Sequence, residues 1–532
     1  MVGARRFWLA ALTLITLLGV IQILTIRDET ATFDEPVHIA AGYSYFATGS
    51  FAMNAEHPPL SKLLSSLPLL AFYHPHLDTQ SEQWKSKDFL MVGNYFLYRN
   101  TSPPDTLLFA ARLPTIALTL AFAAYLASWT RRRFGPAAGL FALAMLVFDP
   151  TIIAHGRYVT SDLAVTLFIF STCTLWIEYL LKPRWTFALA TGVSLGLALG
   201  SKYSAFFLPP VLMMMAAPYL KRQVAAALAL VFTTSAAVLA MLYAPDLWAN
   251  LPPLLPALHR NGVAGKLLAV VAATFHLPAY TVLLGLDNVA NHVDSGHPSY
   301  LLGQVGNQGW WYYFPVAFAV KSTVAALVGL ALLLALVWKH PQRRLIATIL
   351  FPALVYFGLS MTSHLNIGIR HLLPVYPFLY AATAAVLHEH KRWKLILPLA
   401  AALECAAIYP DYLSFFNLAA GGPVAGHRYL LDSNLDWGQD YKKLARYLKA
   451  QQVDHICLSY FANIDFPQYG FTQEPIPEGT QNSDRLNCVT VVSGTHLFGQ
   501  LVGLERFAWL RPVKPTAIIG HSLYVYDFRK KQ

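Results

Sequence analysis

The sequence predicts a polytopic α-helical membrane protein that ends in a small α/β domain. Hydrophobic residues make up 56% of the 532 positions, and charged residues make up only 13%. A soluble chain of this length could not bury so much apolar surface. Apolar runs long enough to cross a bilayer recur along the chain, and we expect about eleven transmembrane helices within residues 1–410. From residue 411 the composition turns polar, which indicates a separate domain over 411–532.

The first segment, residues 1–26, has Arg5 and Arg6 followed by an apolar run and no small-x-small cleavage site, so it is expected to be a retained helix. The polar stretch 27–105 is too long for a turn and is expected to form a structured loop. A second long loop, 245–310, contains an apolar part at 264–286 that is expected to lie along the membrane interface, and an aromatic cluster at 310–313 follows it. The other predicted spans are 107–129, 137–153, 163–181, 186–201, 204–220, 224–244, 313–338, 345–361, 372–388 and 394–410.

The net charge of +11 does not indicate nucleic-acid binding. Its basic residues form short clusters between the apolar runs, which is typical of cytoplasmic loops under the positive-inside rule. The clusters lie at 131–133, 182–184, 221–222, 343–344 and 391–392. The loops at 27–105, 149–162, 245–310 and 364–371 then fall on the other side. We therefore expect a multi-pass protein of the inner (plasma) membrane whose long loops and C-terminal domain face outward.

In the polar tail, the pattern predicts a helix at 438–451, strands at 456–460 and 488–492, a helix near 495–510 and a strand at 517–527. Cys457 and Cys488 could form a disulfide if this domain lies outside the cytoplasm. Cys173 and Cys405 lie in apolar runs and are expected to be small core residues. The segment 432–440 holds three acids, and it either caps the following helix or covers an active site. Its spacing departs from a calcium-binding EF-hand loop.

Two adjacent carboxylates, Asp34 and Glu35, follow the first predicted helix. A carboxylate at the outer surface can take a proton from an attacking hydroxyl, and two neighbouring acids raise each other's pKa. The alternative is structural, because Thr32 or Asp34 could cap a helix that begins near Pro36. His38 lies one turn further on, but two ligands do not make a metal site. No metal or other cofactor is therefore predicted.

Residues 57–62, with the sequence HPPLSK, place His57 and Lys62 on either side of a rigid turn, where they could face a phosphate. Further outer cations precede predicted spans, and an outer lysine or arginine beside the bilayer suggests an anionic ligand or a buried acid as its partner. The candidate phosphate-binding residues are His57, Lys62, Arg157, Lys202, Arg370 and His371. The alternatives are a capped turn with a snorkelling lysine and separate surface cations.

The acid pair, the HPPLSK motif, Arg112-Leu113-Pro114 and the stretch 157–162 resemble the protein O-mannosyltransferase family. More broadly, they resemble integral-membrane glycosyltransferases of the GT-C fold, including the aminoarabinose lipid A transferases. Residues 309–315 and 368–377 are similar to bacterial members. The resemblance covers roughly residues 1–380. The acid pair together with the HPPL motif is fairly specific, and the other pieces are weak individually.

The resemblance implies an enzyme that takes a sugar from a polyprenyl-phosphate carrier and passes it, with inversion, to an acceptor on the extracytoplasmic face. Asp34 would then be the general base, and Glu35 would support it or bind the acceptor. Lys62, Lys202 and Arg370 would contact the carrier phosphate. Expected partners are this lipid-linked donor, membrane lipids, and a lipid, glycan or protein acceptor.

The 245–310 loop is too short for the β-trefoil insert of the eukaryotic mannosyltransferases, so neither the acceptor nor the sugar follows from the resemblance. Two alternatives remain open at this point. One is a transporter or flippase for lipid-linked sugars, and the other is a non-catalytic envelope assembly protein. The sequence contains no P-loop, GxGxxG or CxxC motif that would indicate another class of enzyme.

Overall fold

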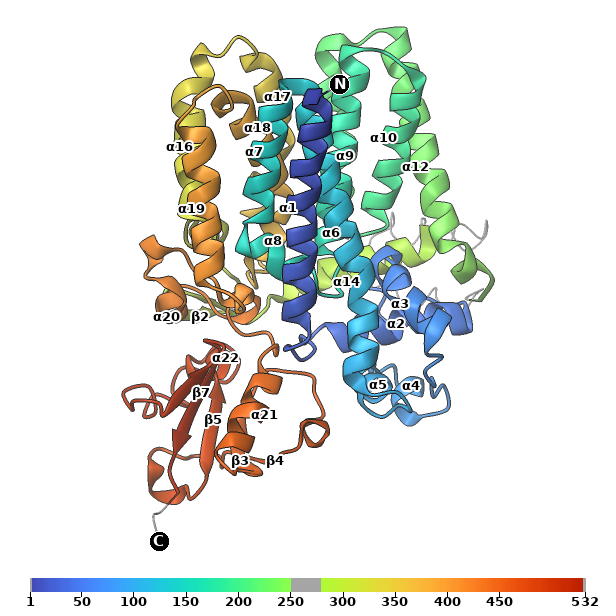
Figure 1. Cartoon of the computed structure of the whole chain (residues 1–532). Coiled ribbons are helices and arrows are strands. Elements are labelled where there is room, and N and C mark those ends of the chain that lie inside the picture. Colours follow the sequence, from blue (N-terminus) through green and yellow to red (C-terminus); the bar gives the residue numbers. More distant parts are fainter. Residues whose placement is uncertain (1, 250–278, 530–532) are drawn as a thin grey trace.

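The computed structural model of the chain describes residues 2–249 and 279–529. Most of these residues form a bundle of helices, and the C-terminal α/β domain lies at the end of the bundle opposite the N-terminus (Figure 1). The first polar stretch lies at the same end as this domain. The chain therefore brings its two most polar regions together.

The bundle consists of apolar helices that run alongside one another (Figure 1). They are α1 (Val2–Ile26), α6 (Pro104–Phe134), α7 (Pro136–Val147), α9 (Asp162–Leu181), α10 (Trp185–Leu199), α11 (Leu208–Ala216), α12 (Arg222–Ala249), α16 (Val324–Leu336), α17 (Arg343–Ser360), α18 (Tyr376–Leu387) and α19 (Trp393–Ala407). A helix suits a bilayer because it satisfies its own backbone hydrogen bonds. Among the described residues, α1, α6, α9, α12 and α17 contain stretches long and apolar enough to span a membrane. The bent pair formed by residues 313–321 and 324–339 is a sixth candidate if it counts as one span. The chain is thus a multi-pass membrane protein, while the count of about eleven stays a prediction.

The predicted span at 313–338 is not one straight helix, because the chain bends there. Helix α15 (Tyr313–Lys321) and helix α16 meet at 112°. Ser322 and Thr323 have extended backbones between them, and the Thr323 side chain accepts a hydrogen bond from Ala326 N, which starts the second helix. Lys321 is buried at this bend and donates to the carbonyl oxygens of Leu413 and Asn434. The bend therefore ties the bundle to the segment after residue 411.

The first polar stretch is folded, as predicted. It forms α2 (Glu35–Thr48), α3 (Leu60–Phe72), α4 (Glu82–Lys85) and α5 (Phe89–Tyr98). The second long loop is described from residue 279, where α14 (Ala279–Ser295) and the hairpin of β1 (Ser299–Leu301) and β2 (Gln304–Gly306) begin. Most of the predicted interfacial part, 264–286, lies outside the described residues.

The C-terminal domain is built on one mixed sheet. Its strands are β3 (His455–Ser459), β4 (Thr472–Pro475), β5 (Val489–Ser493), β6 (Ala517–Ile519) and β7 (Leu523–Asp527), in the order β4-β3-β5-β7-β6. Helix α21 (Tyr441–Ala450) precedes the sheet, close to the predicted helix. The predicted helix near 495–510 is wrong, because α22 covers only Gly494–Leu497 and turns follow it. Cys457 and Cys488 form a disulfide between β3 and the residue before β5.

The C-terminal residues belong to three hydrophobic cores, one of which, with Val492 and Leu497, consists of C-terminal residues alone. Side chains from 412 to 437, among them Leu435 and Trp437, pack in the core of the helical bundle. Side chains from Tyr441 onward, among them Val491, pack with α2, α5 and the start of α6. The α/β domain is therefore joined to the bundle by a segment that the bundle itself buries.

Candidate active site

Asp34 lies immediately before α2, at the N-cap position, with Pro36 in the first turn. Its side chain forms no capping hydrogen bond. Instead, Asp34 Oδ2 accepts a 3.0 Å hydrogen bond from Arg370 Nη1. The Asp34 side chain is 27% exposed, whereas that of its neighbour Glu35 is fully buried. The two adjacent acids therefore have different environments.

Glu35 is held by a ring of donors. Arg112, from α6, makes a two-pronged pair with it at 2.8 and 2.6 Å. The backbone nitrogens of Thr32 and Val159 donate to the same carboxylate at 2.8 and 3.0 Å. With so many donors, Glu35 is suited to hold the turn before α2 rather than to exchange a proton. The sequence pointed to Arg112 only through the resemblance of residues 112–114.

Two of the predicted phosphate-binding cations meet at one buried acid. Asp162, at the start of α9, accepts a 2.5 Å hydrogen bond from Lys202 Nζ and lies 3.7 Å from Arg370 Nη1. Lys202 Nζ also lies 3.5 Å from His371 Nδ1. Asp34, Asp162, Lys202, Arg370 and His371, which we call the Asp34 cluster, thus form one connected group. Its members come from four separate places in the sequence, because Arg370 and His371 are neighbours.

Several nitrogen atoms in and around this cluster have no hydrogen-bond partner within the described part of the protein. They are His38 Nδ1, Arg370 Nε and His371 Nε2. Buried polar atoms are nearly always bonded, so these three nitrogens have bonding capacity left for a ligand or a water molecule. Burial also lowers the pKa of His38 to about 4 and holds the pKa values of His57 and His371 well below the usual value. These imidazoles are therefore neutral at pH 7.

The HPPLSK motif lies next to the cluster but is used differently from the prediction. The rings of His57 and His38 are 5.0 Å apart. Lys62, the last residue of the motif, is buried, and its ammonium donates to Tyr45 Oη, Asn54 O and Asn54 Oδ1 at 2.6 to 3.0 Å. Burial holds the pKa of Lys62 well below its usual value. Lys62 therefore stabilises the loop before α3 with all three of its donors.

Arg157 forms a separate buried pair. It donates to Glu29 at 3.1 and 2.5 Å and to Ile153 O at 3.1 Å. Both side chains of the pair are almost fully buried. Arg157 thus does not join the Asp34 cluster in the structure. Glu29 had no distinguishing signal in the sequence.

Trp437 is a further residue at this site. The sequence singled it out only as part of segment 432–440, which was predicted either to cap a helix or to cover an active site. Its ring lies 4.2 Å from the Arg370 guanidinium carbon. The alternative that segment 432–440 caps a helix finds no support at Asp440, the N-cap residue of α21, whose side chain makes no capping bond. The segment contributes instead to the surroundings of the Asp34 cluster.

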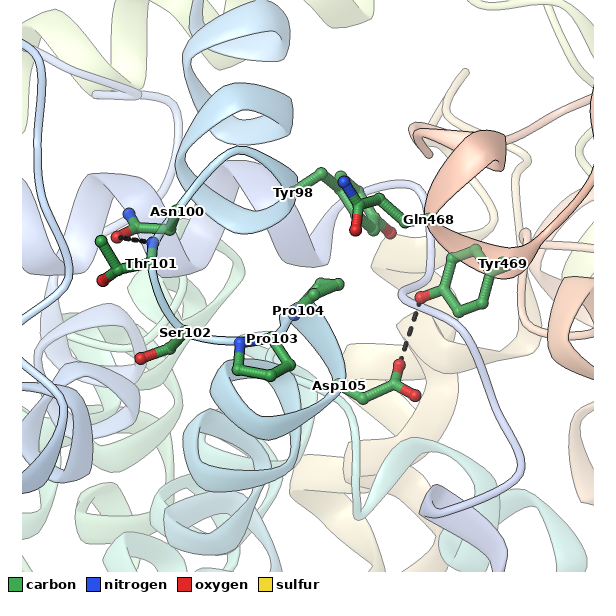
Figure 2. A pocket seen from close by; sticks show the side chains of 9 residues that line it. All are labelled: Tyr98, Asn100, Thr101, Ser102, Pro103, Pro104, Asp105, Gln468 and Tyr469. Atoms are coloured by element: carbon green, nitrogen blue, oxygen red, sulfur yellow. Dashed lines mark hydrogen bonds between the residues drawn. The ribbon is translucent and has the colours of Figure 1, made fainter.

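Two other features lie away from this cluster. In the described residues, the group of side chains spaced to hold a metal ion is Cys457, Glu474 and Cys488, and the disulfide removes its two thiolates. A pocket of about 360 Å³ opens between the start of α6 and residues 468–469. Figure 2 shows Tyr469 and Asp105 facing each other there, joined by a 3.2 Å hydrogen bond. None of the pocket's lining residues belongs to the Asp34 cluster.

Comparison with known proteins connects this geometry to a family. Residues 10–248 match the family described as dolichyl-phosphate-mannose-protein mannosyltransferase. Two proteins of Candida albicans are similar in this region. Dolichyl-phosphate-mannose–protein mannosyltransferase 4 is 29% identical over 213 residues, which are 38% of this chain and 26% of that protein. Dolichyl-phosphate-mannose–protein mannosyltransferase 1 is 24% identical over 216 residues, which are 39% of this chain and 22% of that protein. The match therefore spans about a quarter of each relative.

Similarity over the full length comes from a solved structure. The crystal structure of ArnT from Cupriavidus metallidurans, bound to undecaprenyl phosphate, covers 98% of this chain and 99% of its own, with a TM-score of 0.51 and 12% identity. At this identity the likeness establishes the fold. Asp34, Asp162 and Lys202 lie inside the family match, whereas Arg370 and His371 lie outside it. Residues 10–248 thus resemble the protein O-mannosyltransferase family, and the whole chain has a membrane fold like that of ArnT.

Proposed function

We propose that this protein transfers a sugar from a polyprenyl-phosphate carrier to an acceptor at the extracytoplasmic face of the membrane. The observation that carries the proposal is the pairing of Asp34, which lies within the family match to mannosyltransferases, with Arg370, beside Lys202. A carboxylate base and two cations are the groups that displacement of a phosphate by a hydroxyl requires.

In the proposed reaction, Asp34 accepts the proton of the acceptor hydroxyl while that oxygen attacks the anomeric carbon. The bond from that carbon to the phosphate oxygen breaks, and its electrons leave with the polyprenyl phosphate. A single displacement of this kind inverts the anomeric centre. Asp34 suits the role because its side chain is 27% exposed, whereas that of Asp162 is 2% exposed.

The leaving phosphate is assigned to Arg370 and Lys202. Arg370 has a second donor, Nε, without a partner in the described protein, and a guanidinium fork matches phosphate oxygens. A bound phosphate would compete with Asp34 for the single positive charge of Arg370. Donor binding would therefore weaken the Arg370–Asp34 bond and free the carboxylate for the acceptor.

The remaining candidates act more indirectly in this proposal. Glu35 holds the turn that presents Asp34, through Arg112 and Val159 N. His57 and His371 are neutral donors or acceptors near the sugar and phosphate. Lys62 and Arg157 stabilise the surrounding loops, because their donors are already taken. No metal ion has a role in the proposed chemistry.

The sidedness rests on charge. Arg131, in the last turn of α6, lies 4.7 Å from the Phe7 ring in the first turns of α1, so two basic clusters share one end of the bundle. The positive-inside rule assigns that end to the cytoplasm. The Asp34 cluster and the α/β domain would then face outward, as the predicted location in the inner (plasma) membrane requires.

The test is a transfer assay in membranes that contain the full chain. Polyprenyl-phosphate sugars are supplied one at a time, beginning with mannose because the relatives' names contain it, and released polyprenyl phosphate is measured. Release that depends on the protein establishes the reaction and identifies the donor. Absence of release with every donor, from protein that retains its helical signal, would refute the proposal.

A further inference from the structure

Trp437 connects the C-terminal part of the chain to the Asp34 cluster. The residue is 1% exposed, and its ring lies 4.2 Å from the Arg370 guanidinium carbon. His155 and Tyr158 surround the same ring, with centroids 6.1 Å away. A guanidinium against an indole face is attracted to the ring as well as packed on it. Trp437 therefore restricts where the Arg370 side chain can lie.

The backbone around Trp437 holds the chain that leads into Asp34. Trp437 O accepts a 2.8 Å hydrogen bond from Phe33 N, one residue before Asp34. Gln439 O accepts from Thr30 N at 2.9 Å, and Gly438 O accepts from the Thr30 hydroxyl at 2.6 Å. Residues 437–439 thus fix residues 30–33, and through them the approach to α2.

The same segment holds the chain that leads into Arg370. Asn434 Oδ1 accepts a 2.9 Å hydrogen bond from Ile369 N, and the Ser433 hydroxyl donates to Ile367 O at 2.6 Å. Gly368 lies so close that a Cβ there would be 2.2 Å from Ser433 Oγ. Residues 433–439 therefore contact the chain before Asp34 (residues 30–33) and the chain before Arg370 (residues 367–369). We call these two segments the arms of the Asp34–Arg370 pair.

The segment is anchored in turn to the α/β domain. Asp436 Oδ2 accepts from Thr495 N at 3.1 Å, and Asp440 Oδ2 accepts from the Ser522 hydroxyl at 2.7 Å. Thr495 is in α22 and Ser522 precedes β7. The α/β domain thus holds Asp436 and Asp440, which lie on either side of Trp437 in the sequence.

We propose that Trp437 is a positioning residue that holds Arg370 against Asp34, and that the C-terminal domain is, through residues 433–439, a structural part of the active site. The functional half of this inference rests on the proposed sugar transfer. The structural half does not, because it predicts how the two arms respond to a change at Trp437 whatever the reaction is.

The first test measures hydrogen–deuterium exchange of the full chain in detergent or nanodiscs. Trp437→Leu removes the aromatic face, and Trp437→Phe keeps one. We expect backbone exchange in 30–36 and 366–373 to rise about tenfold in Trp437→Leu and to stay within about twofold of wild type in Trp437→Phe. Trp509→Leu, which alters a tryptophan packed in a separate core of the α/β domain, should change neither peptide. Unchanged exchange at both arms in Trp437→Leu would overturn the inference.

A second variant covers the case in which Trp437→Leu fails to fold. Asn434→Ala removes the acceptor for Ile369 N and the donations of Asn434 Nδ2 to Tyr313 Oη and Leu431 O. None of these bonds involves residues 30–36, so exchange should rise in 366–373 and not in 30–36. Equal exchange in both peptides, at wild-type rates, would contradict the assignment of the two arms.

The functional half is tested by transfer kinetics on the same variants. Misplacing Arg370 should raise the donor KM of Trp437→Leu about tenfold and leave the acceptor KM unchanged, with Trp437→Phe close to wild type. A normal donor KM despite faster exchange would refute the link to the donor phosphate. If wild-type protein transfers no sugar, the proposed function fails, and the exchange data still decide the positioning inference.

Discussion

Arg370 Nη1 donates a 3.0 Å hydrogen bond to Asp34 Oδ2, and so joins two residues that are 336 positions apart in the sequence. Each residue begins a short segment that leads into a helix, α2 for Asp34 and, through η5 (Ile369–Val375), α18 for Arg370. The pair lies beside a second acid, Asp162, that is already neutralised by Lys202. The base and the phosphate-binding cation of the proposed reaction thus start in contact with each other.

Arg370→Lys tests the guanidinium fork. A lysine keeps the charge but offers a single donor centre, so the donor KM is expected to rise about tenfold. The measurement is transfer rate against donor concentration. Arg446→Lys is the matched control, because Arg446 is an exposed partner of Asp28 far from the cluster in sequence. A donor KM for Arg370→Lys equal to that of the control would argue against the assigned role.

Glu35→Gln tests whether the role of Glu35 is to stabilise the fold or to take part in the proposed proton transfer. The change removes the negative charge that faces the buried Arg112 guanidinium, and breaking a buried pair in this way costs about 3–5 kcal/mol. Unfolding in denaturant, followed by circular dichroism, should show that loss. Glu82→Gln, at an exposed pair with Lys85, should cost less than about 0.5 kcal/mol. Stability equal to wild type in Glu35→Gln would show that the pair is dispensable.

These two acids illustrate what the sequence could and could not predict. Position and residue type were enough to select Asp34 and Glu35 as a pair, and to select Arg370 and Lys202 as outer cations. They could not divide the roles of the acids, because that depends on Arg112 and Val159 N, which reach Glu35 from other parts of the chain. Arg157 was selected by the same reasoning as Arg370, yet in the structure its guanidinium is paired with the buried Glu29 carboxylate.

Stability should fall between pH 6.5 and pH 4 in part because of His38. Burial is the largest cause of its pKa of about 4, compared with 6.5 in the unfolded chain. As the pH falls through this window, the unfolded state binds a proton that the folded state does not, so the folded state loses on the order of 3 kcal/mol. Above pH 6.5 His38 makes no such contribution. Replacing His38 with Gln should flatten this dependence, as measured by unfolding at several pH values.

The exposed His76 provides the control, since His76→Gln should retain the wild-type slope. The same slope in His38→Gln would mean that other groups account for the whole acid sensitivity.

The disulfide between Cys457 and Cys488 should stabilise the α/β domain. It closes a loop with a sequence separation of 31, and its removal is expected to cost about 2–4 kcal/mol. Cys457→Ser together with Cys488→Ser should lower the unfolding temperature, and the wild-type chain should migrate differently with and without reductant. Identical migration would mean that the bond does not form in the cell.

Local pattern predicted the helices and strands well where tertiary contacts did not intervene. The first helix, α9 and β5 agree with their apolar runs. The apolar pattern at 313–338 did not reveal the bend at Ser322 and Thr323, where a new helix starts at 112° to the first. Segment 432–440 was ambiguous because its polar residues bond to the chain near residues 30 and 369. Such distant pairing has no periodic signal in a single sequence.

The most direct test of the central claim compares Asp34→Asn with wild type in the polyprenyl phosphate release assay. The amide keeps the size of the side chain and cannot accept the proton, so release should fall by about 10²–10⁴-fold while the helical signal is retained. Asp28→Asn, an exposed acid six positions earlier, should leave release unchanged. Release from Asp34→Asn at the rate of Asp28→Asn would contradict the assignment of Asp34 as the base.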